Sequence, residues 1–219
     1  MDAQQDKKTK IWSLDIIKLL DKKLICRGLY QFDICKQSYY MKWVKNKLEY
    51  QVGKELEKLN RKEFLIPICL LTENPNDKRP IMKHIYNKNF YFVVTKEMKG
   101  KELDCVIPEL STEEFQLVIQ KIVDALESAW NQIQFVHGDL HLRNIFVDGM
   151  EPIIFDFEHS TMHGLHPKKT FQKDLWTFLT NLALNTKNEK AEVVFQFVDK
   201  YFNDREKFQE SLYACLPNF

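Results

Sequence analysis

The stretch at 134–160 reads Q-F-V-H-G-D-L-H-L-R-N-I-F-V-D-G-M-E-P-I-I-F-D-F-E-H-S and contains most of the polar residues that suggest chemistry. Asp139 is followed five residues later by Asn144, and then by two short apolar runs on either side of Asp148-Gly149. This pattern predicts a loop followed by a β-hairpin, with Asp156 at the end of the second strand.

Asp139, Asn144 and Asp156 are the residue types that phosphoryl transfer requires. One carboxylate can orient an attacking hydroxyl group, while an amide oxygen and a second carboxylate can hold Mg²⁺ against the phosphates. The spacing of the three residues therefore indicates a phosphotransferase site.

The motifs H-G-D-L-H-L-R-N and D-F-E resemble the catalytic and metal-binding loops of the protein-kinase-like superfamily, which includes protein kinases and the aminoglycoside, choline and lipopolysaccharide-core kinases. The resemblance implies an α+β, two-lobed fold that binds ATP between its lobes. The lobes are expected at 1–94 (β-rich N-lobe) and 104–219 (mainly helical C-lobe), with a hinge at 95–103.

The resemblance also implies roles for individual residues. Asp139 is expected to be the catalytic base, with His137 supporting its loop, and Asn144 and Asp156 are expected to bind Mg²⁺ or Mn²⁺. His141 stands where protein kinases usually have a lysine that contacts the γ-phosphate.

Lys42, in Y-Y-M-K-W, occupies the place of the kinase lysine that binds the phosphates. A helix is expected at 46–60, and Glu55 falls within its apolar stripe. A carboxylate in that position needs a cation, because an unpaired buried charge is costly. We therefore expect Lys42 to pair with Glu55, with Glu49 as the alternative partner.

The remaining nucleotide contacts are expected from position alone. Gly28 is the one glycine in the predicted hairpin that would cover the nucleotide, although a glycine there is also typical of an ordinary turn. The segment after the apolar strand at 90–95 is placed as the hinge, so that the backbone at Glu97 and Met98 would contact adenine. An ordinary linker between a strand and a helix would have the same sequence pattern.

Several features depart from typical protein kinases. Gly138 replaces the arginine that receives an activation-loop phosphate, and Glu158 replaces the glycine of D-F-G. Only 17 residues separate Asp156 from Asp174, and no A-P-E motif follows. The peptide-docking platform is therefore expected to be reduced. Asp174, in K-D-L-W, is expected to accept hydrogen bonds from backbone N–H groups of the catalytic loop.

Helical periodicity dominates the rest of the chain. Ser111 or Thr112 can cap a long helix that runs almost to the catalytic loop, and two more helices are expected at 189–202 and 205–216. An additional helix is expected at 11–20, after a polar tail.

Composition limits the possible classes of protein. The chain has 219 residues, an apolar fraction of 44% and a net charge of +1, which indicates a globular protein without a general affinity for nucleic acid. The N-terminus does not resemble a secretory signal, and no apolar run approaches the roughly 18 residues of a membrane span. Five scattered cysteines without a C-x-x-C pair favour reduced thiols and hence a cytoplasmic location, including a host cytosol.

The acceptor is expected to be Ser or Thr of a protein, because the chain lacks the helical insertions that form small-molecule pockets in larger relatives. The absent A-P-E motif favours the alternative, a kinase of a sugar, aminoalcohol or antibiotic. Two other interpretations are a pseudokinase that binds partners and a zinc hydrolase. The zinc interpretation arises because five of the six histidines lie between residues 137 and 166.

Overall fold

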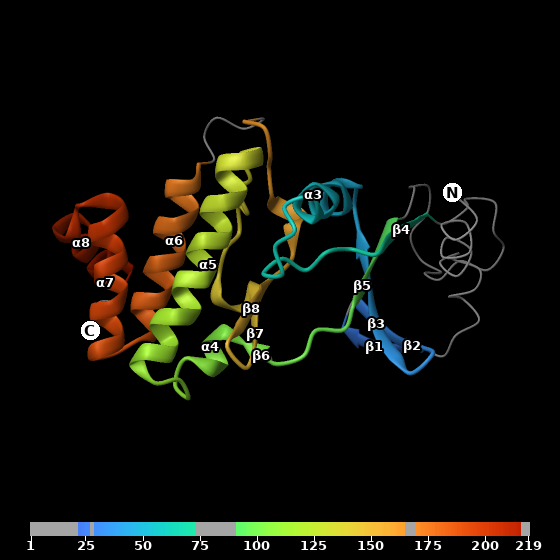
Figure 1. Ribbon diagram of the computed structural model, residues 1–219, viewed down its shortest axis with the longest axis horizontal. Helices are drawn as coiled ribbons and strands as arrows, with labels where there is room; N and C mark the ends of the chain where they lie inside the picture. The colour runs from blue at the N-terminus through green and yellow to red at the C-terminus, as the bar shows by residue number, and fades with distance from the viewer. Residues whose placement is uncertain (1–21, 27–28, 73–90, 165–169, 216–219) are drawn as a thin grey trace. The chain divides into compact units, whose positions relative to one another are not determined.

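The structure, a computed structural model, describes residues 22–26, 29–72, 91–164 and 170–215 (Figure 1). The chain divides into two compact units, which are described separately below: Met1–Lys54 with Ile66–Met98, and Glu55–Leu65 with Lys99–Phe219. The helix expected at 11–20 and the turn at Gly28 lie outside the described residues.

The first unit contains a five-stranded antiparallel sheet in the order β1-β2-β3-β5-β4. Its strands are β1 (Lys22–Cys26), β2 (Leu29–Ile34), β3 (Gln37–Val44), β4 (Cys69–Thr72) and β5 (Tyr91–Lys96). The expected β-rich N-terminal part is confirmed.

Side chains on the two faces of β3 have different surroundings, because successive side chains in a strand point to opposite faces. Met41 is fully buried in an apolar cluster with Phe32 and Phe92. Lys42, the next residue, therefore lies on the opposite face of the sheet, where it contacts Glu49 of helix α3 (Leu48–Glu57).

Helix α3 is shorter than the helix expected at 46–60, and a different set of its residues is buried. The buried residues are Glu49, Val52, Gly53 and Leu56, which follow the i, i+3, i+4, i+7 spacing of one helix face. Gly53 lies directly against Pro67, and a Cβ atom at position 53 would overlap the Pro67 ring. A glycine inside a helix costs about 1 kcal/mol relative to alanine, and this close contact explains its presence here.

In its described residues, the second unit combines five α-helices with a three-stranded antiparallel sheet in the order β6-β7-β8. The helices are α4 (Leu103–Val106), α5 (Thr112–Ile133), α6 (Phe171–Asn185), α7 (Glu189–Phe202) and α8 (Arg205–Cys215), and the strands are β6 (Lys101–Glu102), β7 (Ile145–Asp148) and β8 (Glu151–Ile154).

Helix α5 is the centre of the second unit and packs against α6, α7 and β8 (Figure 1). It begins with a capping box: Ser111 Oγ accepts from Glu114 N at 3.1 Å, and Glu114 Oε2 accepts from Ser111 N at 2.8 Å. The expected start is confirmed. None of the described helices is long and apolar enough to cross a membrane.

The hairpin β7-β8 is confirmed, but its turn is one residue later than expected. Asp148 pairs with Glu151, so the two turn residues are Gly149 and Met150. Strand β8 ends at Ile154, two residues before Asp156.

Residues 55–65 join the second unit rather than the first, in contrast to the expected N-lobe at 1–94. Phe64 forms a parallel bridge with Ile154, whose backbone N–H donates to Glu63 O at 2.7 Å and whose carbonyl accepts from Leu65 N at 2.9 Å. These backbone bonds attach the segment to the edge of β8.

The contact between Gly53 and Pro67 leads to a stability prediction. Gly53→Ala is expected to destabilise the protein by about 1–3 kcal/mol, because the added methyl group forces the helix away from the Pro67 ring. Urea unfolding measures the effect, and Gln51→Ala on the exposed face of α3 is the matched control. A gain in stability for Gly53→Ala, as at an open helix position, would show that the close contact is absent.

Candidate active site

The loop between α5 and β7 carries the catalytic motif and is fixed by Asp174 on α6. Asp174 Oδ2 accepts a hydrogen bond from His137 N at 2.6 Å, and Oδ1 accepts from Gly138 N at 3.0 Å. Asp174 is 8% exposed. Buried N–H groups need acceptors, so one carboxylate both satisfies the loop backbone and determines its path. The role expected for Asp174 is confirmed.

Two features determine the path of the loop backbone: the conformation of Gly138 and a hydrogen bond near the end of the loop. Gly138 has φ +79°, a left-handed conformation that favours glycine, which accounts for glycine where protein kinases have arginine. Beyond it, Asn144 Nδ2 donates to Asp139 O at 2.9 Å and closes the loop. The side chain of Asp139 remains half exposed, while Asn144 is buried.

The catalytic loop is joined to the segment that contains D-F-E by three connections. Val136 and Thr161 exchange two backbone hydrogen bonds of 2.9 Å each. Ser160 Oγ donates to His137 O at 3.0 Å, and His137 Nε2 lies 2.8 Å from Phe155 O. Asp139 and Asp156 are therefore presented by two segments that are bonded to each other.

His137 is a neutral structural residue. It is fully buried among the rings of Phe135 and Phe157, and burial lowers its pKa to about 4 despite the opposing effects of the Phe155 carbonyl, Asp156 and Asp139. A neutral imidazole facing a carbonyl oxygen must carry its hydrogen on Nε2. The expectation that His137 supports the loop agrees with this geometry.

Asn144 and Asp156 fit a divalent cation by the chemistry of their donor atoms. Because Asn144 Nδ2 donates to Asp139 O, its Oδ1 is the atom left for a ligand. Asp156 adds carboxylate oxygens and has a left-handed backbone, with φ +65°, at the start of the 3₁₀ turn η2 (Phe157–His159). Hard oxygen donors of this kind suit Mg²⁺ and Mn²⁺.

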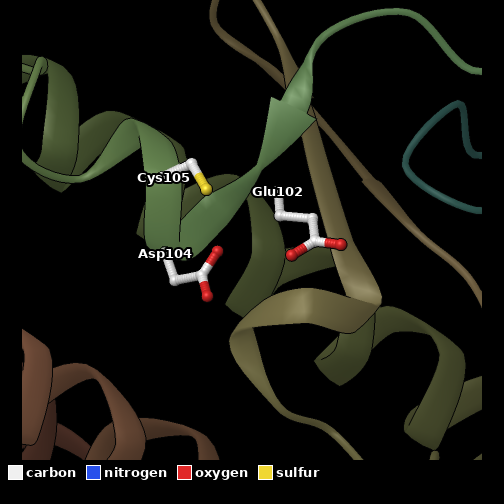
Figure 2. Close-up of side chains that lie close together, drawn as sticks. All are labelled: Glu102, Asp104 and Cys105. Carbon is white, nitrogen blue, oxygen red and sulfur yellow. The ribbon is translucent and has the colours of Figure 1, made fainter.

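Arg143 holds the other side of the loop. It lies in the 3₁₀ turn η1 (Leu142–Asn144), and its Nε donates to Asp104 Oδ2 at 3.1 Å and lies 4.0 Å from Glu102 Oε2. Figure 2 shows Glu102 and Asp104 together with Cys105, and the potential ligand atoms of the three lie within 4.8 Å of one another. The hydrogen bond from Arg143 to Asp104 connects this cluster to the loop.

The histidines do not form a zinc site in the part of the chain that the structure describes. The one group there of three or more potential metal ligands from His, Cys, Asp or Glu contains no histidine. His141 instead lies with Nε2 3.9 Å from Asp139 Oδ2, and both side chains are about half exposed.

The pairing expected for Lys42 is wrong. In the first unit, Lys42 Nζ donates to Glu49 Oε2 at 3.0 Å, whereas both carboxylate oxygens of Glu55 accept from Lys58 Nζ, at 2.6 and 2.7 Å. The physical reason is the helix stripe: Glu49 lies on the buried face of α3 and is 7% exposed, while Glu55 is turned away from it.

At the expected hinge, the atoms of Glu97 are already engaged within the first unit. Its backbone N–H donates to Ser38 O at 3.0 Å, and its Oε1 accepts from Gln31 Nε2 at 2.7 Å and lies 3.4 Å from Tyr40 Oη. A role for Glu97 N–H in adenine binding is therefore disfavoured, and the contact proposed for Met98 is not tested by this geometry.

Sequence reasoning missed Ser160 and Arg143. Arg143 lies inside the quoted motif, and its charge next to Asn144 was a usable signal. Ser160 had none, because its partner is a backbone carbonyl 23 residues away.

The sheet of the first unit and the helices of the second form the mixed α+β architecture that the kinase resemblance predicts. Residues 100–166 match the sequence profile of APH, the phosphotransferase enzyme family. This region contains the catalytic loop, the hairpin and D-F-E. A search of curated protein sequences finds no match.

Two solved kinases have similar structures. The amicoumacin kinase hAmiN, in complex with AMP-PNP, Ca²⁺ and Ami, is 13% identical, with a TM-score of 0.60 over 94% of this chain and 78% of that chain. The Cydia pomonella granulovirus kinase PK-1 is 15% identical, with a TM-score of 0.52 over 72% of this chain, which spans 57% of that kinase. The two solved structures show that the chain has a kinase-like fold, and the family match over residues 100–166 lies in the region of the catalytic and D-F-E motifs.

Because Asp174 accepts hydrogen bonds from two backbone N–H groups, replacing it with the isosteric residue Asn is expected to reduce stability strongly. Asp174→Asn is expected to lower the free energy of unfolding by about 2–4 kcal/mol, because the charged acceptor is lost and an amide N–H group can face His137 N or Gly138 N. Urea unfolding tests this, with Asp124→Asn on the exposed face of α5 as the control. Equal stability of the two variants would contradict the structural role of Asp174.

Burial of His137 predicts a pH-dependent stability. The pKa of His137 is about 6.5 in the unfolded chain and about 4 in the fold, so the unfolded state binds the additional proton between these values. Stability is full above pH 6.5 and is lost as the pH falls towards 4. From pH 7 to pH 5 the loss attributable to this group is about 2 kcal/mol.

The variant His137→Gln is expected to lose about 2 kcal/mol less than the wild type between pH 7 and pH 5, because glutamine can donate to Phe155 O without titrating. The exposed His163→Gln is expected to retain the wild-type pH dependence. Parallel stability profiles for His137→Gln and the wild type would show that His137 is protonated in the fold.

Proposed function

We propose that this chain transfers the γ-phosphoryl group of ATP to a hydroxyl group of a small molecule. The observation that carries the proposal is the fixed catalytic loop. Asp174 satisfies its backbone, Asn144 closes it, and the carboxylate of Asp139 is left exposed to solvent. A carboxylate held in this way is suited to orienting an acceptor hydroxyl.

The residues have distinct roles in this proposal. Asp139 accepts the proton of the acceptor hydroxyl, whose oxygen attacks the γ-phosphorus. Asn144 and Asp156 would hold Mg²⁺ or Mn²⁺, which neutralises phosphate charge when it is bound. Lys42, oriented by Glu49, would bind the phosphates.

The small-molecule acceptor is preferred to a protein for two reasons. The segment between Asp156 and Asp174 is short and lacks A-P-E, so it offers little chain for docking an extended peptide. The family match is to phosphotransferases of the APH type, and the similar kinase hAmiN was solved with a small molecule, Ami. Labelled ATP, incubated separately with a metabolite fraction and a protein lysate, tests this preference. Label found only in protein would overturn it.

Replacement of the base gives the sharpest test of the activity. Asp139→Asn is expected to reduce phosphoryl transfer by about 10²–10⁴-fold, because proton transfer loses its acceptor. Its affinity for AMP-PNP with Mg²⁺, measured by calorimetry, is expected to remain unchanged. Asp156→Asn is expected to weaken that affinity, and the exposed Asp148→Asn is expected to behave as the wild type in both measurements.

Transfer at the native rate by Asp139→Asn would show that Asp139 is not the base. A wild-type protein that binds Mg·AMP-PNP but labels nothing in either pool would instead be a pseudokinase.

A further inference from the structure

A cavity of about 240 Å³ lies beside Asp139 within the second unit. One wall is the catalytic loop, including Asp139 and His141, and the other is the N-terminal half of α6. Ligand sites for drug-sized molecules have roughly 300–1,000 Å³, so this cavity suits a smaller compound.

The wall formed by α6 is polar. Lys173, Thr177 and Asn181 lie at i, i+4 and i+8 and therefore on one face of the helix. Thr177 Oγ1 donates to Lys173 O at 3.0 Å, and Asn181 Nδ2 donates to Thr177 O at 2.9 Å. The Thr177 hydroxyl oxygen and the Oδ1 atom of Asn181 can still accept hydrogen bonds, which a hydroxylated compound would donate.

Lys173 is the one cationic residue of α6 at this cavity. Its side chain is exposed, and it forms no ion pair with any described residue. The neighbouring carboxylate of Asp174 is directed to His137 N and Gly138 N. Lys173 also lies in the first turn of α6, where a cation is unfavourable for the helix. Helix stability therefore does not explain this lysine, whereas an anionic ligand would.

We propose that this cavity binds the acceptor, and that the acceptor is a small hydroxylated anion whose carboxylate or phosphate group is bound by Lys173. The inference rests on the proposed function and adds the substrate class. In the reaction the acceptor hydroxyl oxygen forms a bond to the γ-phosphorus, the bond from that phosphorus to the β–γ bridging oxygen breaks, and ADP leaves. The hydroxyl proton passes to Asp139.

A set of matched acceptors tests the class. The probes are glycerate and a hexose 6-phosphate as anions, glycerol and the free hexose as neutral compounds, and ethanolamine as a cation. The anions are expected to have a kcat/KM at least tenfold higher than their neutral counterparts. A preference for the neutral compounds or the cation, or no binding of either anion by calorimetry in the presence of Mg·ADP, would overturn the proposal.

Variants of Lys173 identify the residue responsible. Lys173→Met is expected to raise KM for the anionic acceptors at least tenfold with little change in kcat, while Lys173→Arg retains most of the affinity. The exposed Lys207→Met on α8 is the matched control and is expected to be unaffected. An unchanged KM in Lys173→Met would refute the role of Lys173.

These experiments distinguish a failure of the anionic-acceptor proposal from a failure of the proposed phosphotransferase function. ATP binding and the effect of Asp139→Asn report on the phosphotransferase activity itself, and Lys173→Met is expected to leave the affinity for Mg·AMP-PNP unchanged. If activity is lost in Asp139→Asn but unchanged in Lys173→Met, the proposed kinase activity stands and the proposal of an anionic acceptor is wrong.

Discussion

The bond from the Asp174 carboxylate to two consecutive backbone N–H groups is the interaction on which the catalytic loop depends. The loop leaves α5 and passes through the interior, where backbone groups are costly unless they are hydrogen-bonded. A charged acceptor on α6 satisfies His137 N and Gly138 N together. The direction of Asp139, the next residue, follows from this constraint, and no contact of its own side chain is needed to hold it.

The second constraint is the neutral imidazole of His137. It packs against two phenylalanine rings and reaches the carbonyl of Phe155, immediately before Asp156. A charged residue in this position would need a buried counterion, and an apolar one would leave the carbonyl without this donor. Neutral histidine satisfies both requirements, and so the two acidic segments are connected through one buried ring without adding charge to the site.

The sequence predicted those features that depend on local chemistry. The Ser111 cap, the hairpin and the position of Asp174 each follow from residues close to one another or from a motif of fixed spacing. The pairing of Lys42 was wrong because two helix stripes were compatible with the sequence, and the choice depended on Gly53 fitting against Pro67, 14 residues away. The hydrogen bond from Ser160 to His137 O could not be predicted from the sequence either, because every residue has a backbone carbonyl that could accept it.

Helix α6 connects the stability of the loop with the proposed acceptor cavity. Its first turn carries adjacent residues of opposite charge, Lys173 and Asp174, which would neutralise each other in solvent. Here Asp174 is buried and its carboxylate accepts hydrogen bonds from the loop backbone, while Lys173 is exposed at the cavity. The separation leaves a cation on the cavity wall opposite the carboxylate of Asp139. An acceptor with a hydroxyl at one end and an anionic group at the other would complement both charges, whereas a cationic acceptor would have its favourable contact only with Asp139, the proposed base.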